Sequence, residues 1–285
     1  MAQNVRSIKS RIGNITDIAQ ITKAMNAIAM TKLTRIKRQL DSIRPYMTDL
    51  DAFTQRLLGR LSADAEAHPL TAPNKVEEIG VFVLNSDRGL CGRYKGDLNR
   101  KTEELLSEHG RNSRLILGGE KARLYFARRH VNTLATYSHT YDQPTAEIAG
   151  RIANELMTHY ETDEVGRVDL VYMTFLSDLS QRVVVQQFLP LELQPTSNDD
   201  LIDPEAEVML DIAVRMTLRA KLYAALLETK TSEIAIRRQA MKAATDNAED
   251  LITSLTRAYN KARQQAITRE IADIIGGAEA LRMNE

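Results

Sequence analysis

The chain has 285 residues with 38 basic and 38 acidic side chains, and its zero net charge excludes a general electrostatic attraction to nucleic acid. Hydrophobic residues make up 43% of the sequence but aromatic residues only 5%, and Trp is absent, which favours closely packed helices over the core of a compact enzyme. The single cysteine, Cys91, excludes an internal disulfide and a C-x-x-C pair. No run of about 18 apolar residues occurs, so no membrane-spanning segment is predicted.

Charge is distributed unevenly along the chain. Residues 1–60 carry a net charge of +7, the middle of the chain carries −7, and residues 205–285 are balanced. A basic N-terminal segment predicts contact with an acidic surface, although on charge alone a solvated helix face explains it equally well.

The first 58 residues predict one long helix, because apolar residues recur at steps of three and four. Only Pro45 is expected to interrupt it. The basic, amphipathic N-terminus imitates a transit peptide, but the same periodicity continues past residue 40, so we interpret it as the start of the helix. The apolar positions are Val5, Ile8, Ile12, Ile15, Ile18, Ile21, Met25, Ile28, Leu33, Ile36, Leu40, Ile43, Met47 and Leu50.

Residues 204–285 predict a second long helix, which starts at Asp203-Pro204 and contains no further proline. Two terminal helices of this length, with a domain between them, are predicted to pair as an antiparallel coiled coil. The predicted stripe comprises Met209, Ile212, Met216, Tyr223, Leu226, Ile234, Met241, Ala248, Leu251, Leu255, Ala258, Ala262 and Ala266.

The middle of the chain, residues 75–195, alternates between strand and helix patterns. Strands are predicted at 78–85, 114–119, 168–175 and 182–191. One helix is predicted to follow the turn at 86–92 and to end near residue 109, and two more are predicted at 120–130 and 144–160. This alternation predicts a central Rossmann-like α/β domain with a mainly parallel sheet. Residues 59–75 and 194–200 are the expected linkers to the helices.

No catalytic, cofactor-binding or metal-binding residue is predicted. The turn at 86–92 (SDRGLCG) matches neither G-x-G-x-x-G nor G-x-x-x-x-G-K-[ST], so we interpret it as a structural turn between a strand and a helix. Gly118-Gly119 is a weaker candidate still. Cys91 is expected to be buried and inert, and the five histidines form no metal-binding pattern.

Four segments carry a family resemblance that covers essentially the whole chain in order. They are residues 20–33 (QITKAMNAIAMTKL), 84–92 (LNSDRGLCG), 170–191 and 221–281. Together they resemble the gamma subunits of F-type ATP synthases of the bacterial type. The resemblance implies a non-catalytic rotor subunit that transmits rotation between a proton- or sodium-driven membrane ring and the catalytic alpha/beta hexamer.

The resemblance also implies partners and partner-binding residues. One copy per complex would contact the alpha, beta and epsilon subunits and the c-ring, on the cytoplasmic face of a bacterial membrane and without entering it. Lys23 and Met25 would lie where the helical shaft passes the acidic lever loop of a beta subunit. Arg263 and Gln264 would bind a catch loop of beta, and Thr268 and Glu270 would lie on a stretch that packs near Met25.

The sequence departs from the family pattern at two places. Asn198-Asp199-Asp200-Leu201-Ile202 replaces the aromatic and Glu residues usual before the C-terminal helix, so no ring-contact residue is carried over. Arg93-Tyr94 replaces the smaller residues usual after LCG, and the insertion with paired cysteines found in chloroplast members is absent. Two alternatives stay open: an α/β nucleotide-binding enzyme with helical arms, and a coiled-coil scaffold that forms homodimers.

Overall fold

The computed structural model describes residues 2–58, 68–129, 131–192 and 206–282, which divide into two compact units. One unit comprises residues 1–28 and 238–285, and the other comprises residues 29–237. The two predicted long helices are confirmed as α1 (Ala2–Leu58), which includes Pro45, and α5 (Ala206–Arg282), and each contributes to both units. The expected linker 194–200, most of the linker 59–75, the helix start at Asp203-Pro204 and the departure at 198–202 lie outside the described residues.

A five-stranded sheet forms the centre of the unit 29–237. Its strands are β1 (Ile79–Leu84), β2 (Ser113–Gly118), β3 (Thr133–Tyr137), β4 (Arg167–Phe175) and β5 (Gln181–Leu189), in the order β3-β2-β1-β4-β5. The first four are parallel and β5 pairs antiparallel with β4, which confirms the predicted mainly parallel sheet. β3 was not predicted from the sequence, because this edge strand is mostly not buried and lacks a continuous apolar run.

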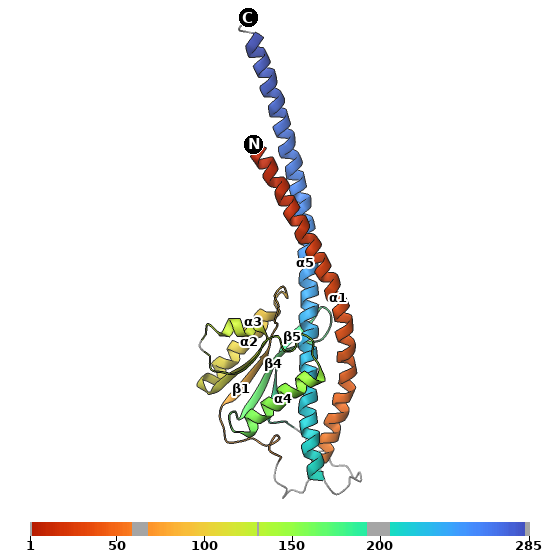
Figure 1. Cartoon of the computed structure of the whole chain (residues 1–285), viewed down its shortest axis with the longest axis vertical. Coiled ribbons are helices and arrows are strands. Elements are labelled where there is room, and N and C mark those ends of the chain that lie inside the picture. Colours follow the sequence, from red (N-terminus) through yellow and green to blue (C-terminus); the bar gives the residue numbers. More distant parts are fainter. Residues whose placement is uncertain (1, 59–67, 130, 193–205, 283–285) are drawn as a thin grey trace. The chain divides into compact units, whose positions relative to one another are not determined.

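Helices cover both faces of this sheet (Figure 1). α2 (Tyr94–His109) and α3 (Glu120–Phe126) pack on one face, and a short 3-10 helix (Gly110–Asn112) follows α2. α4 (Ala146–Glu161) and α5 pack on the other face. The alternation along β1 fits these layers: Val81 and Val83 belong to the first core, Phe82 and Leu84 to the second. α5 is therefore a layer of the α/β domain as well as a partner of α1.

Within the same unit, α1 and α5 run antiparallel. Thr54 Oγ1 lies 2.9 Å from Thr217 Oγ1, and Lys221 Nζ lies 3.5 Å from a carboxylate oxygen of Asp51. Arg44 Nη2 lies 3.9 Å from Glu228 Oε1, so residue numbers fall along α1 as they rise along α5. These contacts confirm the predicted antiparallel pairing.

The predicted apolar stripe of α5 was wrong near its start. Met209, Ile212 and Met216 are exposed, whereas the neighbouring residues Leu210, Ala213, Val214 and Leu218 are buried. The reason is that α5 packs against both α1 and the sheet layer, so its buried surface is wider than one stripe and is centred on other positions. The exposed side chains line a groove of about 390 Å³, together with Tyr46 and Phe53 of α1.

In the unit of residues 1–28 and 238–285, the two helices meet through small side chains. Thr22 Oγ1 lies 2.8 Å from Thr245 Oγ1, and Ala19 and Ala248 are buried. Ile18, Ile21 and Ile28 were predicted to face the partner helix but are each more than half exposed. Small residues at the contact let the helices approach closely, which leaves these larger apolar side chains on the surface.

Removing the buried hydroxyl pair Thr54–Thr217 is expected to destabilise the chain. In Thr54→Val the hydroxyl of Thr217 loses its 2.9 Å partner, and an unsatisfied buried hydroxyl costs about 1–3 kcal/mol of unfolding free energy. The double variant Thr54→Val/Thr217→Val removes both hydroxyls and is expected to cost less than the sum of the single changes. Urea unfolding of the full chain measures this, and strictly additive costs would contradict a direct interaction.

Candidate functional site: a polar contact between α5 and the sheet

The turn that follows β1 is held by buried polar side chains. Asp87 Oδ1 accepts hydrogen bonds from the backbone N–H of Glu120 at 2.9 Å and of His139 at 2.8 Å, so one carboxylate joins three loops. Asn85 Nδ2 donates to Asn99 Oδ1 at 2.7 Å, which fixes the turn to α2. These contacts support the predicted structural role of the segment 86–92, and Cys91 within it is buried as expected.

Two hydroxyl side chains of α5 bond directly to the backbone of the sheet. β4 continues beyond the end of β1, since the last residue pair between them is Val83 with Val171. Past that point, Thr229 Oγ1 donates to Leu84 O at 3.2 Å and accepts from Met173 N at 3.3 Å. Ser232 Oγ donates to Met173 O at 3.0 Å. α5 therefore satisfies backbone groups that have lost their partner strand.

Charged side chains of α5 also bond to two loops of the domain. Lys230 Nζ lies 2.6 Å from Asp142 Oδ1 and 3.0 Å from Glu233 Oε2. Arg237 Nη2 lies 2.6 Å from Glu233 Oε1 and 3.4 Å from the carbonyl oxygen of Gly89. The side chains of Lys230 and Glu233 are only 8% and 3% exposed, so their charges depend on this pairing.

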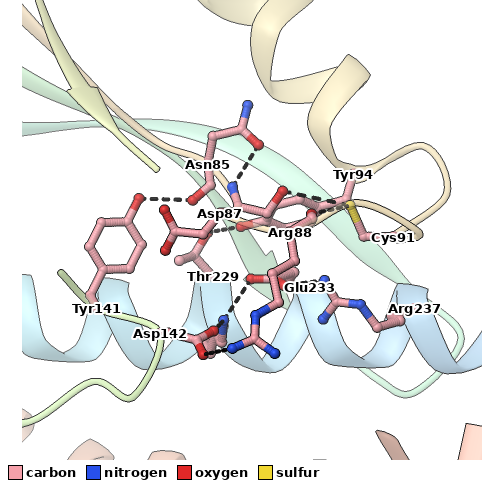
Figure 2. Close-up of polar contacts among 12 residues, drawn as sticks. Asn85, Asp87, Arg88, Cys91, Tyr94, Tyr141, Asp142, Thr229, Glu233 and Arg237 are labelled. Atoms are coloured by element: carbon pink, nitrogen blue, oxygen red, sulfur yellow. Dashed lines mark hydrogen bonds and ion pairs between the residues drawn. The ribbon is translucent and has the colours of Figure 1, made fainter. Parts of the chain in front are cut away.

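Figure 2 shows these groups converging along one side of α5. Arg88 Nη2 adds a second cation to Asp142, at 3.1 Å from Oδ2. Burial opposes ionisation of Asp142, but the hydrogen bond and charge of Lys230 outweigh it, and the pKa of Asp142 is lowered. Burial raises the pKa of Tyr94 and Tyr141 well above the usual value, so both phenols stay protonated. The hydroxyl of Tyr141 donates to Asn85 O at 2.8 Å.

The position of this contact in the sheet bears on the nucleotide hypothesis. The chain leaves β1 toward β2 and β3 on one side and returns to β4 on the other, so the carboxyl ends of β1 and β4 form the topological switch point. In open α/β sheets the ligand binds in the crevice at this point. Here Thr229 and Ser232 bond to the backbone at that place, so α5 occupies it. Over the residues that the structure describes, no group of three or more His, Cys, Asp and Glu side chains could hold a metal ion.

The six partner-binding residues predicted from the resemblance lie elsewhere, on the helices of the unit 1–28 and 238–285. Lys23 is exposed and Met25 is half-buried, next to the Thr22–Thr245 contact. Arg263, Gln264, Thr268 and Glu270 are all exposed on α5, where Thr268 Oγ1 donates to Gln264 O at 3.0 Å.

The structure does not bring these two groups together. Arg263 follows Thr245 by 18 residues, which at about 1.5 Å per residue is about 27 Å along the helix. Thr268 and Glu270 lie farther still along α5. The packing of their stretch near Met25, which the resemblance implied, is therefore not seen in this chain, and their contacts with other subunits stay a prediction.

Four α5 residues of this contact were not predicted from the sequence: Thr229, Lys230, Ser232 and Glu233. One signal could have found them. The predicted apolar stripe of α5 has no member between Leu226 and Ile234, and the six residues 228–233 (ETKTSE) are all polar. A wholly polar run that interrupts an otherwise amphipathic helix can face a polar partner as well as solvent.

The ion pair of Asp142 predicts a specific response to acid. Because the pKa of Asp142 is lowered in the folded chain, its contribution to stability is present above the unfolded-state pKa of about 3.9 and is lost as pH falls through the folded-state value. Asp142→Asn is therefore expected to be less stable than wild type at pH 7, with the difference shrinking below pH 4. Urea unfolding at several pH values measures this, and a difference that is independent of pH would contradict the pairing.

A family model described as ATP synthase matches residues 4–281. The ATP synthase gamma chains of Desulfitobacterium hafniense and Moorella thermoacetica are 37% and 36% identical to this chain, over 98% of it and 99% of each relative. A chain in the rotor structure of the Euglena gracilis mitochondrial ATP synthase superposes with a TM-score of 0.67 at 19% identity, covering 94% of this chain and 100% of that one.

Proposed function

This chain belongs to the ATP synthase gamma chain family, and from that premise we propose that it is the rotor subunit of the central stalk in an F-type ATP synthase. It would transmit rotation between the proton- or sodium-driven membrane ring and the catalytic alpha/beta hexamer. The observation that carries the proposal is the double use of α5. This one helix is a core layer of the α/β domain and also pairs with α1, so the same element serves both units.

We further propose that the chain itself performs no catalysis. Its α/β domain has the topology of nucleotide-binding sheets, but the crevice at the switch point is taken by Thr229 and Ser232 of its own helix. The turn at 86–92 lacks a phosphate-binding pattern, and the carboxylate of Asp87 is used for contacts between loops. ATP chemistry then belongs to the neighbouring subunits, which this chain influences mechanically.

Exposed side chains on the paired helices are the proposed surface for the hexamer. Lys23 and Met25 on α1, with the exposed Arg263, Gln264, Thr268 and Glu270 on α5, would contact beta subunits. The exposed Ile18, Ile21 and Ile28 add apolar surface, which the part of the chain that the structure describes leaves uncovered. Large apolar side chains exposed together on one helix are typical of a surface that meets a partner.

The proposed mechanism rests on symmetry. One copy of this chain presents different residues to each of three equivalent beta subunits, so the three contacts differ in free energy. Only such differences can shift the conformations of otherwise identical neighbours. Rotation would then take each catalytic site through its states in turn.

The remaining partners in the proposal are the epsilon subunit and the c-ring, and the place is the cytoplasmic face of a bacterial membrane. Over the described residues, no helix is long and apolar enough to cross a membrane. Attachment to the membrane would therefore depend on the other subunits of the complex.

Co-expression with alpha and beta subunits tests the proposal. We expect a purified complex that contains three alpha, three beta and one copy of this chain, with ATP hydrolysis that drives ion transport after the membrane sector is added. A stable homodimer in sedimentation would favour the scaffold alternative instead. Tight nucleotide binding by the isolated chain would favour the enzyme alternative.

A further inference from the structure

We propose that the polar contact of α5 with the sheet is the joint through which torque passes between the α/β domain and α5. We call it the anchor, and it consists of Thr229, Lys230, Ser232 and Arg237 of α5 with their partners in the domain, together with Glu233, which pairs with Lys230 and Arg237 on α5 itself. The anchor residues are positioning residues, because they touch neither nucleotide nor transported ion. This inference rests on the proposed rotor function and identifies the residues whose hydrogen bonds and ion pairs would fix α5 to the domain.

The need for such a joint follows from the way the rest of α5 packs. Apart from the hydroxyl groups of Thr217 and Thr231, its other buried side chains in the domain are apolar, among them Leu218, Leu222 and Leu226. Apolar contact is not directional, so it opposes separation of helix and sheet but only weakly opposes rotation of the helix about its own axis. Hydrogen bonds weaken steeply when their angle changes, so they resist such rotation.

The anchor joins α5 to three separate parts of the domain. Thr229 and Ser232 bond to backbone groups of β1 and β4, which are fixed parts of the sheet. Lys230 bonds to Asp142, in the segment that leads from β3 to α4. Arg237 bonds to the carbonyl oxygen of Gly89, in the turn after β1. Figure 2 shows Thr229, Glu233 and Arg237 of α5 with Asp142 beside the helix, and rotation of α5 about its axis would change the angles of the hydrogen bonds made by Thr229, Lys230, Ser232 and Arg237.

The charge pairing permits a variant that weakens the anchor without leaving a buried charge alone. In Lys230→Met, Asp142 keeps Arg88 at 3.1 Å and Glu233 keeps Arg237 at 2.6 Å. The aliphatic part of the lysine is replaced by a side chain of similar length. The bridge from α5 to the segment around Asp142 is then lost, while the fold retains its apolar core.

Lys101→Met is a matched control. Lys101 and Glu104 form an i,i+3 pair at 3.1 Å on α2, as Lys230 and Glu233 do at 3.0 Å on α5. The Lys101 pair lies within one helix and is solvent-exposed, whereas Lys230 also joins two elements. The two substitutions are chemically the same and differ in whether they remove a link between α5 and the domain.

The experiment uses the assembled complex with a magnetic bead attached to the α/β domain. Torsional stiffness comes from the angular fluctuations of the bead. In Lys230→Met we expect the torsional stiffness to fall by up to about twofold, because the variant removes a charge-assisted hydrogen bond, which is about twice as strong as a neutral one. ATP hydrolysis without load should change less than twofold, and Lys101→Met should behave as wild type.

Three further outcomes decide the proposal. Wild-type stiffness in Lys230→Met, and also in Thr229→Val/Ser232→Ala, would overturn the anchor while leaving the rotor function intact. If Lys230→Met fails to assemble, Asp142→Asn removes the charge of the same bridge from the other side, and wild-type stiffness in Asp142→Asn would overturn the anchor. A wild-type bead that does not rotate on addition of ATP would overturn the rotor function, and the anchor with it.

Discussion

Met25→Lys in the assembled complex is expected to reduce ATP-driven ion transport far more than assembly or ATP hydrolysis. Met25 is half-buried on α1, next to the buried hydroxyl contact between Thr22 and Thr245. In the proposed complex it passes an acidic loop of a beta subunit. A new ion pair at about 4 Å contributes about 1–4 kcal/mol, depending on the local dielectric. Strengthening one orientation by that amount changes its population by about fivefold at the lower figure and by several hundredfold at the higher one, and disturbs the sequence of states.

Met25→Leu is the control, because it keeps an apolar side chain of similar volume and adds no charge. Ion transport into vesicles, divided by the rate of ATP hydrolysis, is the quantity to compare between the two variants. A normal ratio in Met25→Lys would show that this position does not face the acidic loop. A loss of assembly in both variants would instead indicate that Met25 serves the pairing of α1 with α5.

The layers of the fold could be predicted from sequence because they follow from short-range periodicity. Continuous apolar runs predicted β1 and β4, which are buried on both faces. Apolar residues spaced three or four positions apart predicted the two long helices. β3 was missed because it lies at the edge of the sheet, where its residues need not be apolar. The buried faces of α1 and α5 were only partly predicted, because small residues such as Ala19 and Thr22 form the contact in place of larger ones.

The candidate site was less predictable because it depends on contacts between distant segments. Thr229 bonds to Leu84 and Met173, and Lys230 bonds to Asp142, which lies 88 residues earlier in the sequence. No local pattern indicates which side chain a lysine in a helix will meet. The predicted partner-binding residues came from a family resemblance, and in the isolated chain they are surface residues whose neighbours would belong to other subunits.

Gly119→Ala is expected to destabilise the chain by about 3–5 kcal/mol, the largest stability effect among these predictions. Gly119 has φ of +85°, which a residue with a Cβ rarely adopts. A Cβ atom there would lie 2.4 Å from the carbonyl oxygen of Asn85, and that backbone begins the turn that carries Arg88 and Gly89. The clash cannot be relieved by a side-chain rotation, so the turn itself must move.

Gly110→Ala separates the two causes. Gly110, at the C-terminus of α2, also has a positive φ of +62°, but a Cβ atom there would have nothing within 4 Å. It should therefore cost only the backbone strain, about 1–3 kcal/mol. Equal losses in the two variants by urea unfolding would contradict the clash. A larger loss in Gly119→Ala, together with weakened binding of the turn to Arg237, would show that this glycine sets the position of one of the partners of α5.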